Sequence, residues 1–432
     1  MDRYLLQKRN IFFLTLEGTI FFLGIAFINQ NTVVALFIHE YSGGVMLAGL
    51  AATIKIASGV APRLIIDPYL CSIRDMPRIT SRFMMIFRPL FLLMVPLLLF
   101  FSHSSITVWI FILFYTVFWC MHAVISMFWM DVFSRTVSIE KRGQVIGNQQ
   151  LFGGIGALFA GFLIKSILDN SRFSTDLKYS IIFSIGSLIL FSSALPMTAV
   201  KDLPRYYIDN TQLSISDFLL NLPKYFKANP QFSKMIIVEC ISKISDLFVP
   251  FIIVYMKDTY KLNIHQVTTL IYIQLAGSFL GGALWGNVSK NFGNKYVIMF
   301  SQINVIIYCS LTIIFSLNKF LPGVFYVICF INLLSAVNSS AWLGFLNYTL
   351  DVSRENDRAN LLVLRSLILF PVSFLNILSG FLGEHYGLVI VIIVSVTFAL
   401  TGTILSSGLK SLKQLKAHCS VDTKESNRLI PT

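Results

Sequence analysis

Long apolar segments recur along the entire chain, and short polar segments separate them. Twelve of them are long enough to cross a bilayer, which takes roughly 20 residues as a helix. They form two groups of six with one longer polar stretch between the groups. The pattern predicts an all-α polytopic membrane protein with two six-helix bundles. The predicted spans cover about 11–36, 45–66, 83–101, 105–130, 145–168 and 178–200, then 235–256, 265–288, 296–317, 321–347, 361–383 and 387–409.

Composition supports a membrane environment over a soluble one. Hydrophobic residues make up 55% of the 432 residues and charged residues only 13%. A soluble domain carries roughly a quarter charged residues because water must solvate its surface. The net charge of +13 lies in short loops and at the chain ends, without a basic face or interleaved aromatic residues. The lipid bilayer is therefore the expected partner, and nucleic acid is not.

The distribution of Lys and Arg among the loops predicts the orientation. With both termini on one side, that side carries 23 of these residues and the opposite side carries 6. Cytoplasmic loops of membrane proteins are enriched in Lys and Arg. An odd number of spans would blur this contrast. We therefore expect an even number of spans and cytoplasmic N- and C-termini, with the protein in the plasma (cytoplasmic) membrane.

The polar stretch 201–234 divides the chain into domains. Three prolines interrupt any continuous helix there, and a capping box at Ser214–Asp217 precedes apolar residues. We expect a cytoplasmic linker with a short amphipathic helix on the membrane surface. The predicted domains are an N-terminal six-helix bundle (1–200), the linker (201–234), a C-terminal six-helix bundle (235–409) and a cytoplasmic polar tail (410–432).

The two halves repeat a short pattern of residues at corresponding places. The first half has Trp129, Arg142-Gly143, Gln149 and Gly161-Phe162-Leu163. The second has Trp342, Arg358-Ala359, Arg365 and Gly380-Phe381-Leu382. Small residues on transmembrane helices allow close helix packing.

The loop after span eight carries a second pattern. It reads Gly286-Asn-Val-Ser-Lys290-Asn-Phe-Gly293-Asn-Lys295. With the repeat, it resembles the major facilitator superfamily, whose loop motif has glycines at this spacing where side chains would clash. The resemblance implies two six-helix bundles related by pseudo-two-fold symmetry and transport by alternating access. It also implies a cytoplasmic gate loop at Gly286, Lys290, Gly293 and Lys295, although Lys290 replaces the motif's aspartate.

Span five is rich in glycine, with small residues every four positions at Gly153, Ala157 and Gly161. Drug/proton exporters of the superfamily carry a Gly-Pro signature in this span. The proline is missing here, so the resemblance favours efflux only slightly. Plain helix packing is the alternative explanation.

Several charges fall inside predicted spans, where each needs a physical reason. Arg88 and Arg365 lie near the cytoplasmic ends, where long side chains can reach water. Glu239, Lys243 and Asp246 are spaced to share one face of span seven, where Lys243 either neutralises both carboxylates or adjoins a water-filled cavity. Spans one and seven line the cavity in the superfamily. The coupling candidates are therefore Glu17, Asp246, Glu239 and Lys243, with Lys55 as a counter-charge or an anion contact.

Uncharged polar residues inside the spans are the candidates for the substrate cavity. They are Asn29, Asn31, Gln149, Gln150, Gln274, Asn338 and Trp342. Asn and Gln side chains also join helices to each other. Taken singly, each side chain fits that structural role. Taken as a set, they favour a cavity for a small organic solute.

The sequence also argues against other classes of function. It contains no GxxxxGK[ST] phosphate-binding loop, so an ion or solute gradient must supply the energy. The six cysteines form no CxxC pair and the six histidines are scattered, so no metal, cofactor or enzyme activity is expected. We predict a monomeric secondary transporter coupled to protons or another ion, as a symporter or antiporter. An uptake permease of the same fold and a membrane enzyme that modifies lipids or acyl groups are the alternatives.

Overall fold

The computed structural model describes residues 3–42, 44–59, 75–100, 105–137, 139–201, 226–227, 229–317, 322–353, 358–411 and 414, and the described elements are all helical. Ten helical segments in these ranges are long and apolar enough to cross a membrane. They span Leu5–Ser42, Met76–Phe100, Ile106–Thr136, Gln144–Asp169, Thr175–Thr198, Ile264–Asn291, Asn294–Leu317, Val324–Val352, Leu364–Tyr386 and Leu388–Ser407. The predicted all-α polytopic fold is confirmed.

The two remaining predicted spans differ from these ten for identifiable reasons. Span two is described only as the apolar helix α3 (Met46–Ala57), because residues 60–74 lie outside the described ranges. Span seven consists of α13 (Pro230–Ser245), the 3₁₀ turn η4 (Asp246–Phe251) and α14 (Ile252–Tyr260). Its charges and the proline in η4 divide it into short helices. The predicted amphipathic helix of the linker also lies outside the described residues.

The chain forms two compact units, which are described separately. Unit 1 comprises Met1–Gln212, Val249–Phe279 and Ser373–Leu388. It therefore combines the first six spans with two segments from the second half of the sequence. Besides α3, α14 and the first part of α15 (Ile264–Asn291), its helices are α1 (Arg3–Ala26), η1 (Gln30–Val34), α2 (Ala35–Ser42), α5 (Met76–Phe87), η3 (Arg88–Leu93), α6 (Met94–Phe100), α7 (Ser105–Thr136), α8 (Ile139–Asp169), α9 (Thr175–Ser192), α10 (Leu195–Thr198) and α20 (Leu375–Tyr386).

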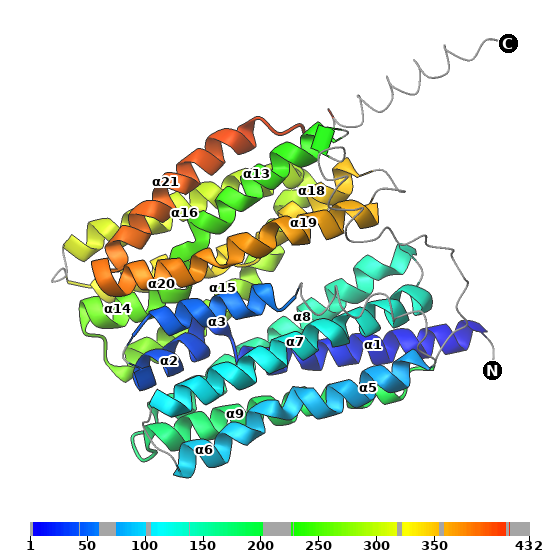
Figure 1. Cartoon of the computed structure of the whole chain (residues 1–432), viewed down its shortest axis with the longest axis horizontal. Helices are drawn as coiled ribbons and strands as arrows, with labels where there is room; N and C mark the ends of the chain where they lie inside the picture. The colour runs from blue at the N-terminus through cyan, green and yellow to red at the C-terminus, as the bar shows by residue number, and fades with distance from the viewer. Residues whose placement is uncertain are drawn as a thin grey trace. The chain divides into compact units, whose positions relative to one another are not determined.

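Helix α1 is the centre of packing in unit 1. It lies against α8, α9 and α7, and these helices run alongside one another in Figure 1. The glycines of α8 permit the contact with α1, since a Cβ at Gly153 would lie 2.5 Å from the Cβ of Phe22. Packing therefore accounts for this part of the glycine-rich pattern in span five.

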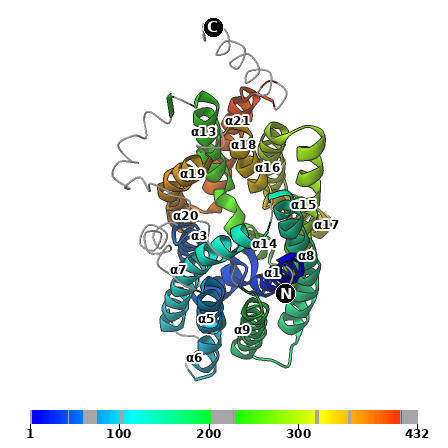
Figure 2. The ribbon, with the colours of Figure 1, turned by 90° about the vertical axis from the view of Figure 1, so that its right-hand side faces the viewer.

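Unit 2 comprises Leu213–Phe248, Leu280–Val372 and Val389–Thr432. Its described helices are α13, the remainder of α15, α16 (Asn294–Leu317), α17 (Val324–Asn338), α18 (Trp342–Val352), α19 (Arg358–Ser373) and α21 (Leu388–Ser407). Figure 2 shows α13, α18 and α21 close to one another. A cluster of buried side chains, including Phe232, Phe345 and Leu364, holds α13, α18 and α19 together.

Several of the described spans are interrupted rather than continuous, among them spans one, seven, ten and eleven. Span one changes from α1 to the π-helical turn η1 after Ala26, and Asn29 caps this turn. Span seven is broken by η4, span ten between Asn338 and Trp342, and span eleven at Phe374. Interrupted transmembrane helices leave backbone groups without intrahelical partners, which is tolerated only inside the protein or beside a cavity.

Candidate functional site

Glu17 and Arg88 form a buried ion pair in unit 1. Arg88 Nη2 lies 2.7 Å from Glu17 Oε1, and both side chains are 3% exposed. The other arm of the guanidinium, Nη1, donates a hydrogen bond to Ser193 Oγ, and the group lies 4.7 Å from the centroid of the Phe21 ring. The expectation that Arg88 reaches water is therefore wrong, because the carboxylate of Glu17 holds it inside the helices.

Glu239 and Arg365 form the corresponding pair in unit 2. Arg365 Nε donates to Glu239 Oε2 at 2.7 Å, and Nη2 donates to Oε1 at 2.5 Å. The Glu239 side chain is fully buried. The alternative in which Lys243 neutralises Glu239 is wrong, because Arg365 occupies both carboxylate oxygens.

Asp246 has a different environment from the two glutamates. It begins the turn η4, and Asn338 Nδ2 donates a hydrogen bond to its Oδ1 at 3.2 Å. Asn338 ends α17, so the breaks of spans seven and ten meet at this hydrogen bond. Within the described ranges no cation lies within ion-pair distance of Asp246. Lys243 is about one turn away, in the last turn of the preceding helix α13.

Lys55 lies within span two of unit 1 and has no acidic partner among the described residues. Its ammonium lies 5.1 Å from the centroid of the Trp119 ring. A charge in mid-membrane costs roughly 2.5–3.5 kcal/mol on insertion scales. A cation–π contact returns about 0.5–2 kcal/mol. The aromatic contact therefore offsets only part of the cost of placing Lys55 in the membrane.

The predicted cavity residues have different local environments within their own units. Gln149 is buried and donates to the Leu14 carbonyl at 2.8 Å, so it joins α8 to α1. Asn29 Oδ1 accepts from the backbone N–H of Asn31, whose own Oδ1 has no hydrogen-bond partner within the described ranges. Gln274 is 2% exposed, and neither its amide oxygen nor its nitrogen has such a partner. Of the other three residues, Gln150 is half-buried, Trp342 is exposed, and Asn338 donates a hydrogen bond to Asp246.

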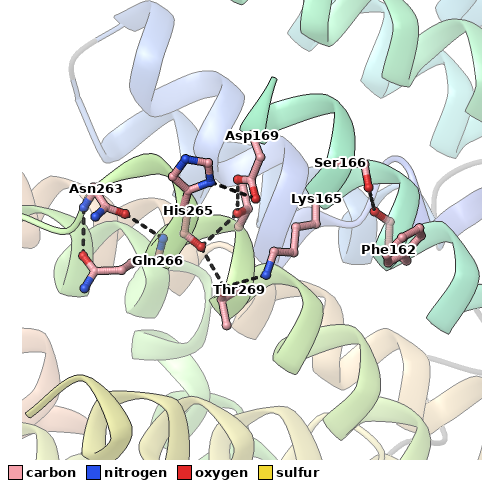
Figure 3. Close-up of polar contacts among 9 residues, drawn as sticks. Phe162, Lys165, Ser166, Asp169, Asn263, His265, Gln266 and Thr269 are labelled. Carbon is pink, nitrogen blue, oxygen red and sulfur yellow. Dashed lines mark hydrogen bonds and ion pairs between the residues drawn. The ribbon is translucent and has the colours of Figure 1, made fainter. Parts of the chain in front are cut away.

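Polar contacts in unit 1 join helices from the two halves of the sequence at one end of the unit. We call this end, where α2, α8 and α14 terminate, the distal end. Figure 3 shows α8 meeting the start of α15 there. Lys165 Nζ donates to Thr269 Oγ1 at 3.0 Å, and Asp169 accepts from the Thr268 hydroxyl. His265 Nδ1 lies 3.1 Å from Asp169 Oδ2.

A second set of distal contacts joins α2 to α14. Glu40 Oε1 lies 3.2 Å from Lys257 Nζ, and its other oxygen accepts from the Tyr179 hydroxyl at 2.9 Å. His39 Nε2 lies 3.3 Å from Asp258 Oδ2. Asp258 lies beyond the predicted span 235–256, and its hydrogen bond with His39 lowers the pKa of its carboxyl below the ordinary value.

The third distal contact is a close approach of α3 and α20, which lie side by side in Figures 1 and 2. A Cβ at Gly49 would lie 2.2 Å from the Asn376 carbonyl oxygen, so only glycine fits there. Thr53 Oγ1 donates to the Ser373 carbonyl at 3.0 Å, and the Met46 N–H donates to Glu384 Oε2 at 3.1 Å. These distal residues were not predicted. The small residues Gly49 and Gly380 were the available signal.

The predicted gate loop is a tight turn in unit 2. Gly293 adopts φ +101°, a backbone conformation that favours glycine. A Cβ at Gly286 would meet nothing within 4 Å, so the steric reason expected for that glycine is absent. Lys295 Nζ donates to the Ser407 carbonyl at 2.7 Å, and the Lys290 side chain is exposed. The loop therefore fastens α16 to α21 through Lys295.

A surface hollow of about 460 Å³ contains none of the predicted site residues; it is lined by Asp75, Arg78, Ser81, Arg82, Met85, Thr198, Val200 and Lys201. Within the described ranges, no three His, Cys, Asp or Glu side chains come together in a way that could hold a metal ion.

Comparisons with known proteins agree with this architecture. Residues 235–425 match the sequence model of the Major Facilitator Superfamily. No curated protein matches the chain in sequence. The chain is similar in structure to a D-xylose–proton symporter, at 12% identity and a TM-score of 0.69 over 94% of this chain and 98% of that one.

Two other solved structures are similar over comparable lengths. The nucleoside transporter NupG has 13% identity and a TM-score of 0.65, over 94% of this chain and 98% of that one. A bacterial homologue of the iron transporter ferroportin, in an inward-facing state, has 13% identity and a TM-score of 0.64, over 95% and 99%. At such identities the likeness establishes the fold. The resemblance predicted from the repeat and the loop after span eight is confirmed.

Proposed function

We propose that this chain, a multi-pass membrane protein of the major facilitator superfamily, is a secondary active transporter that couples movement of a small organic solute to protons. In this proposal it works as a monomer in the cytoplasmic membrane, with both termini in the cytoplasm. Alternating access requires contacts that can close one side of the membrane and release it again. The distal contacts of unit 1 support this requirement.

The distal contacts suit a closure that opens reversibly. They join α2 to α14, α8 to α15 and α3 to α20, so each pairs a helix from the first half of the sequence with one from the second. Several of their polar side chains are partly exposed, including Asp258 and His265. Exposed polar pairs contribute little stability singly, so breaking a few of them costs little free energy.

The proposal of proton coupling rests on the hydrogen-bond partner of Asp246, which is the uncharged amide of Asn338. Protonating Glu17 or Glu239 would leave Arg88 or Arg365 as an uncompensated buried cation, which is strongly unfavourable. Asp246 accepts a hydrogen bond from an amide, so gaining a proton leaves no orphaned cation. Among the five coupling candidates, we therefore assign proton exchange to Asp246.

The glutamates and Lys243 take other roles in this proposal. Glu17 and Glu239 tie helices together, and Lys243 supplies positive charge one turn from Asp246. Close helix packing accounts for the glycines of span five, since a Cβ at Gly154 would also meet Phe279 of α15 at 2.1 Å. These glycines therefore give no support for export over uptake, and we assign no direction.

The proposal is tested with purified protein in liposomes that contain a pH-sensitive dye. Sugars, nucleosides, amino acids and aromatic carboxylates are added one at a time, and the change in lumenal pH is recorded. Asp246→Asn is expected to abolish solute-dependent proton movement while solute exchange without a gradient continues. Asp75→Asn is the control, since Asp75 is exposed and asparagine tolerates its φ of 54°.

Two results would contradict the proposal. Proton movement at the wild-type rate in Asp246→Asn would remove Asp246 as the coupling residue. No solute-dependent flux for any compound in the wild-type protein would remove the transport function itself. A reporter fused to either terminus tests the proposed orientation, and an external signal would contradict it.

A further inference from the structure

Lys55 differs from Arg88, Arg365 and Lys243 because no described carboxylate lies close enough to neutralise it. Arg88 is neutralised by Glu17, and Arg365 by Glu239. Lys243 lies one turn from Asp246 on the same span. Lys55 faces an indole ring, and none of the described carboxylates lies within ion-pair distance of its ammonium. A cation–π contact compensates a desolvated ammonium only in part. Lys55 is therefore a positive site without a counter-anion among the described residues.

The side chain of Lys55 points into unit 1. Thr53 and Gly49 of α3 face the end of α19 and the start of α20, as their contacts with Ser373 and Asn376 show. Lys55 follows Thr53 by two residues, which is about 200° around a helix. It therefore lies on the opposite face, where α3 contacts α7 and Trp119.

Flat aromatic side chains continue from Trp119 across α7 to α1. The rings of Trp119 and His122 lie edge to face with centroids 5.4 Å apart. His122 stacks on Phe21 at 4.8 Å with an interplanar angle of 10°. We call Trp119, His122 and Phe21 the aromatic strip. Arg88, already paired with Glu17, lies over its far end.

The Lys55 ammonium is partly shielded from water by the indole ring that it faces. Trp119 is only 8% exposed, and the ammonium lies 5.1 Å from the centroid of its ring. A partly desolvated charge is strongly unfavourable unless an opposite charge compensates it. The ammonium therefore calls for an anionic oxygen.

We infer that the solute is an organic carboxylate with a flat apolar body, its carboxylate bound by Lys55 and its body lying along the aromatic strip. This inference rests on the proposed transport function and names its substrate class. A neutral sugar would leave Lys55 uncompensated, and an organic cation would be repelled by it. Lysine suits the role because its ammonium is a compact point charge with three donors.

The test is direct binding to the purified full-length protein in detergent by calorimetry, which does not require transport. Phenylacetate is the anionic probe, phenylacetamide its neutral counterpart of the same shape, and acetate the anion without a ring. We expect phenylacetate to bind at least tenfold more tightly than either. Lys55→Gln is expected to weaken phenylacetate binding at least tenfold and to leave phenylacetamide binding unchanged.

Control variants separate binding from folding. Lys141→Gln removes an exposed lysine of the same unit and is expected to bind phenylacetate as the wild type does. Lys55→Arg keeps the charge and should retain the preference for the anion. Lys55→Met removes the uncompensated charge and should raise the thermal unfolding temperature. It provides a folded charge-free variant if Lys55→Gln is unstable.

Three outcomes would overturn the inference. They are equal binding of phenylacetate and phenylacetamide to the wild type, a preference for the anion that survives in both Lys55→Gln and Lys55→Met, and no binding of phenylacetate. Failure of the transport proposal has a different signature. If phenylacetate binding depends on Lys55 but no flux occurs in liposomes, the transport proposal fails and the carboxylate site stands. If flux occurs but does not depend on the charge of the solute, the carboxylate site fails and the transport proposal stands.

Discussion

Arg365 and Glu239 are joined by two hydrogen bonds between α19 and α13. In the sequence repeat, Arg365 corresponds to Gln149, which hydrogen-bonds the Leu14 carbonyl of α1. Helices α1 and α13 begin spans one and seven. The repeat-related positions therefore perform the same task in the two halves, because each ties the fifth span of its half to the first.

Removing one partner of the Arg365–Glu239 pair should destabilise the protein severely. Glu239→Gln leaves the guanidinium without a counter-charge, and breaking a buried pair costs about 3–5 kcal/mol. We expect a large fall in thermal unfolding temperature in detergent. The double variant Glu239→Gln/Arg365→Gln should recover much of the loss. Lys290→Gln, at an exposed position, is the control. A single variant as stable as the wild type would contradict the assignment.

Arg88→Lys should test whether both arms of the guanidinium matter. Arginine contacts Glu17 and Ser193 at once, and a lysine ammonium lacks this fork geometry. The lost charged hydrogen bond is worth about 1.5–3 kcal/mol. Ser193→Ala should cost less, since it keeps the ion pair. If Arg88→Lys unfolds at the wild-type temperature, the charge alone accounts for the contact.

Gly49→Ala should weaken the contact between α3 and α20. The new methyl group would overlap the Asn376 carbonyl, and overpacking of this kind costs about 1–3 kcal/mol. Gly282→Ala is a matched control, because a Cβ at that helical glycine would meet nothing within 4 Å. The control should be neutral or slightly stabilising. Equal unfolding temperatures for the two variants would argue against the close approach.

The distal contact between His39 and Asp258 should make stability depend on pH. The pKa of Asp258 is lowered in the folded protein, chiefly by its hydrogen bond with His39. Such a group stabilises the fold above its unfolded pKa, about 3.9, and the contribution is lost as the pH falls through the folded value.

The variant Asp258→Asn checks this dependence. It should unfold at a lower temperature than the wild type at pH 7, and the gap should close toward pH 3. The effect should stay below about 1 kcal/mol, because the Asp258 side chain is 53% exposed. A gap that widens on acidification would reverse the assigned sign.

Hydropathy was sufficient to predict the class of fold. Each span buries its own backbone hydrogen bonds, so the length of an apolar segment alone predicts a crossing helix. The structure confirms this for ten long segments. Span seven also shows the limit of the method, because Asp246 and Pro250 divide it into pieces too short to be recognised by length.

The partners of the intramembrane charges could not be predicted in the same way. Glu17 and Arg88 are separated by 71 residues, and Glu239 and Arg365 by 126. Spacing along one helix suggested Lys243 as the partner of Glu239, since those two residues share a helical face. The bundle instead brings Arg365 to Glu239 from another helix.

The sequence by itself determined that the chain crosses the membrane repeatedly, that its halves repeat and which charges lie within the spans. These properties are local, since they follow from the cost of placing each residue in lipid. Only the tertiary structure decided which charges are neutralised, and that Asp246 and Lys55 have no counter-charge within ion-pair distance among the described residues. That decision depends on helix packing, which brings together residues far apart in the chain.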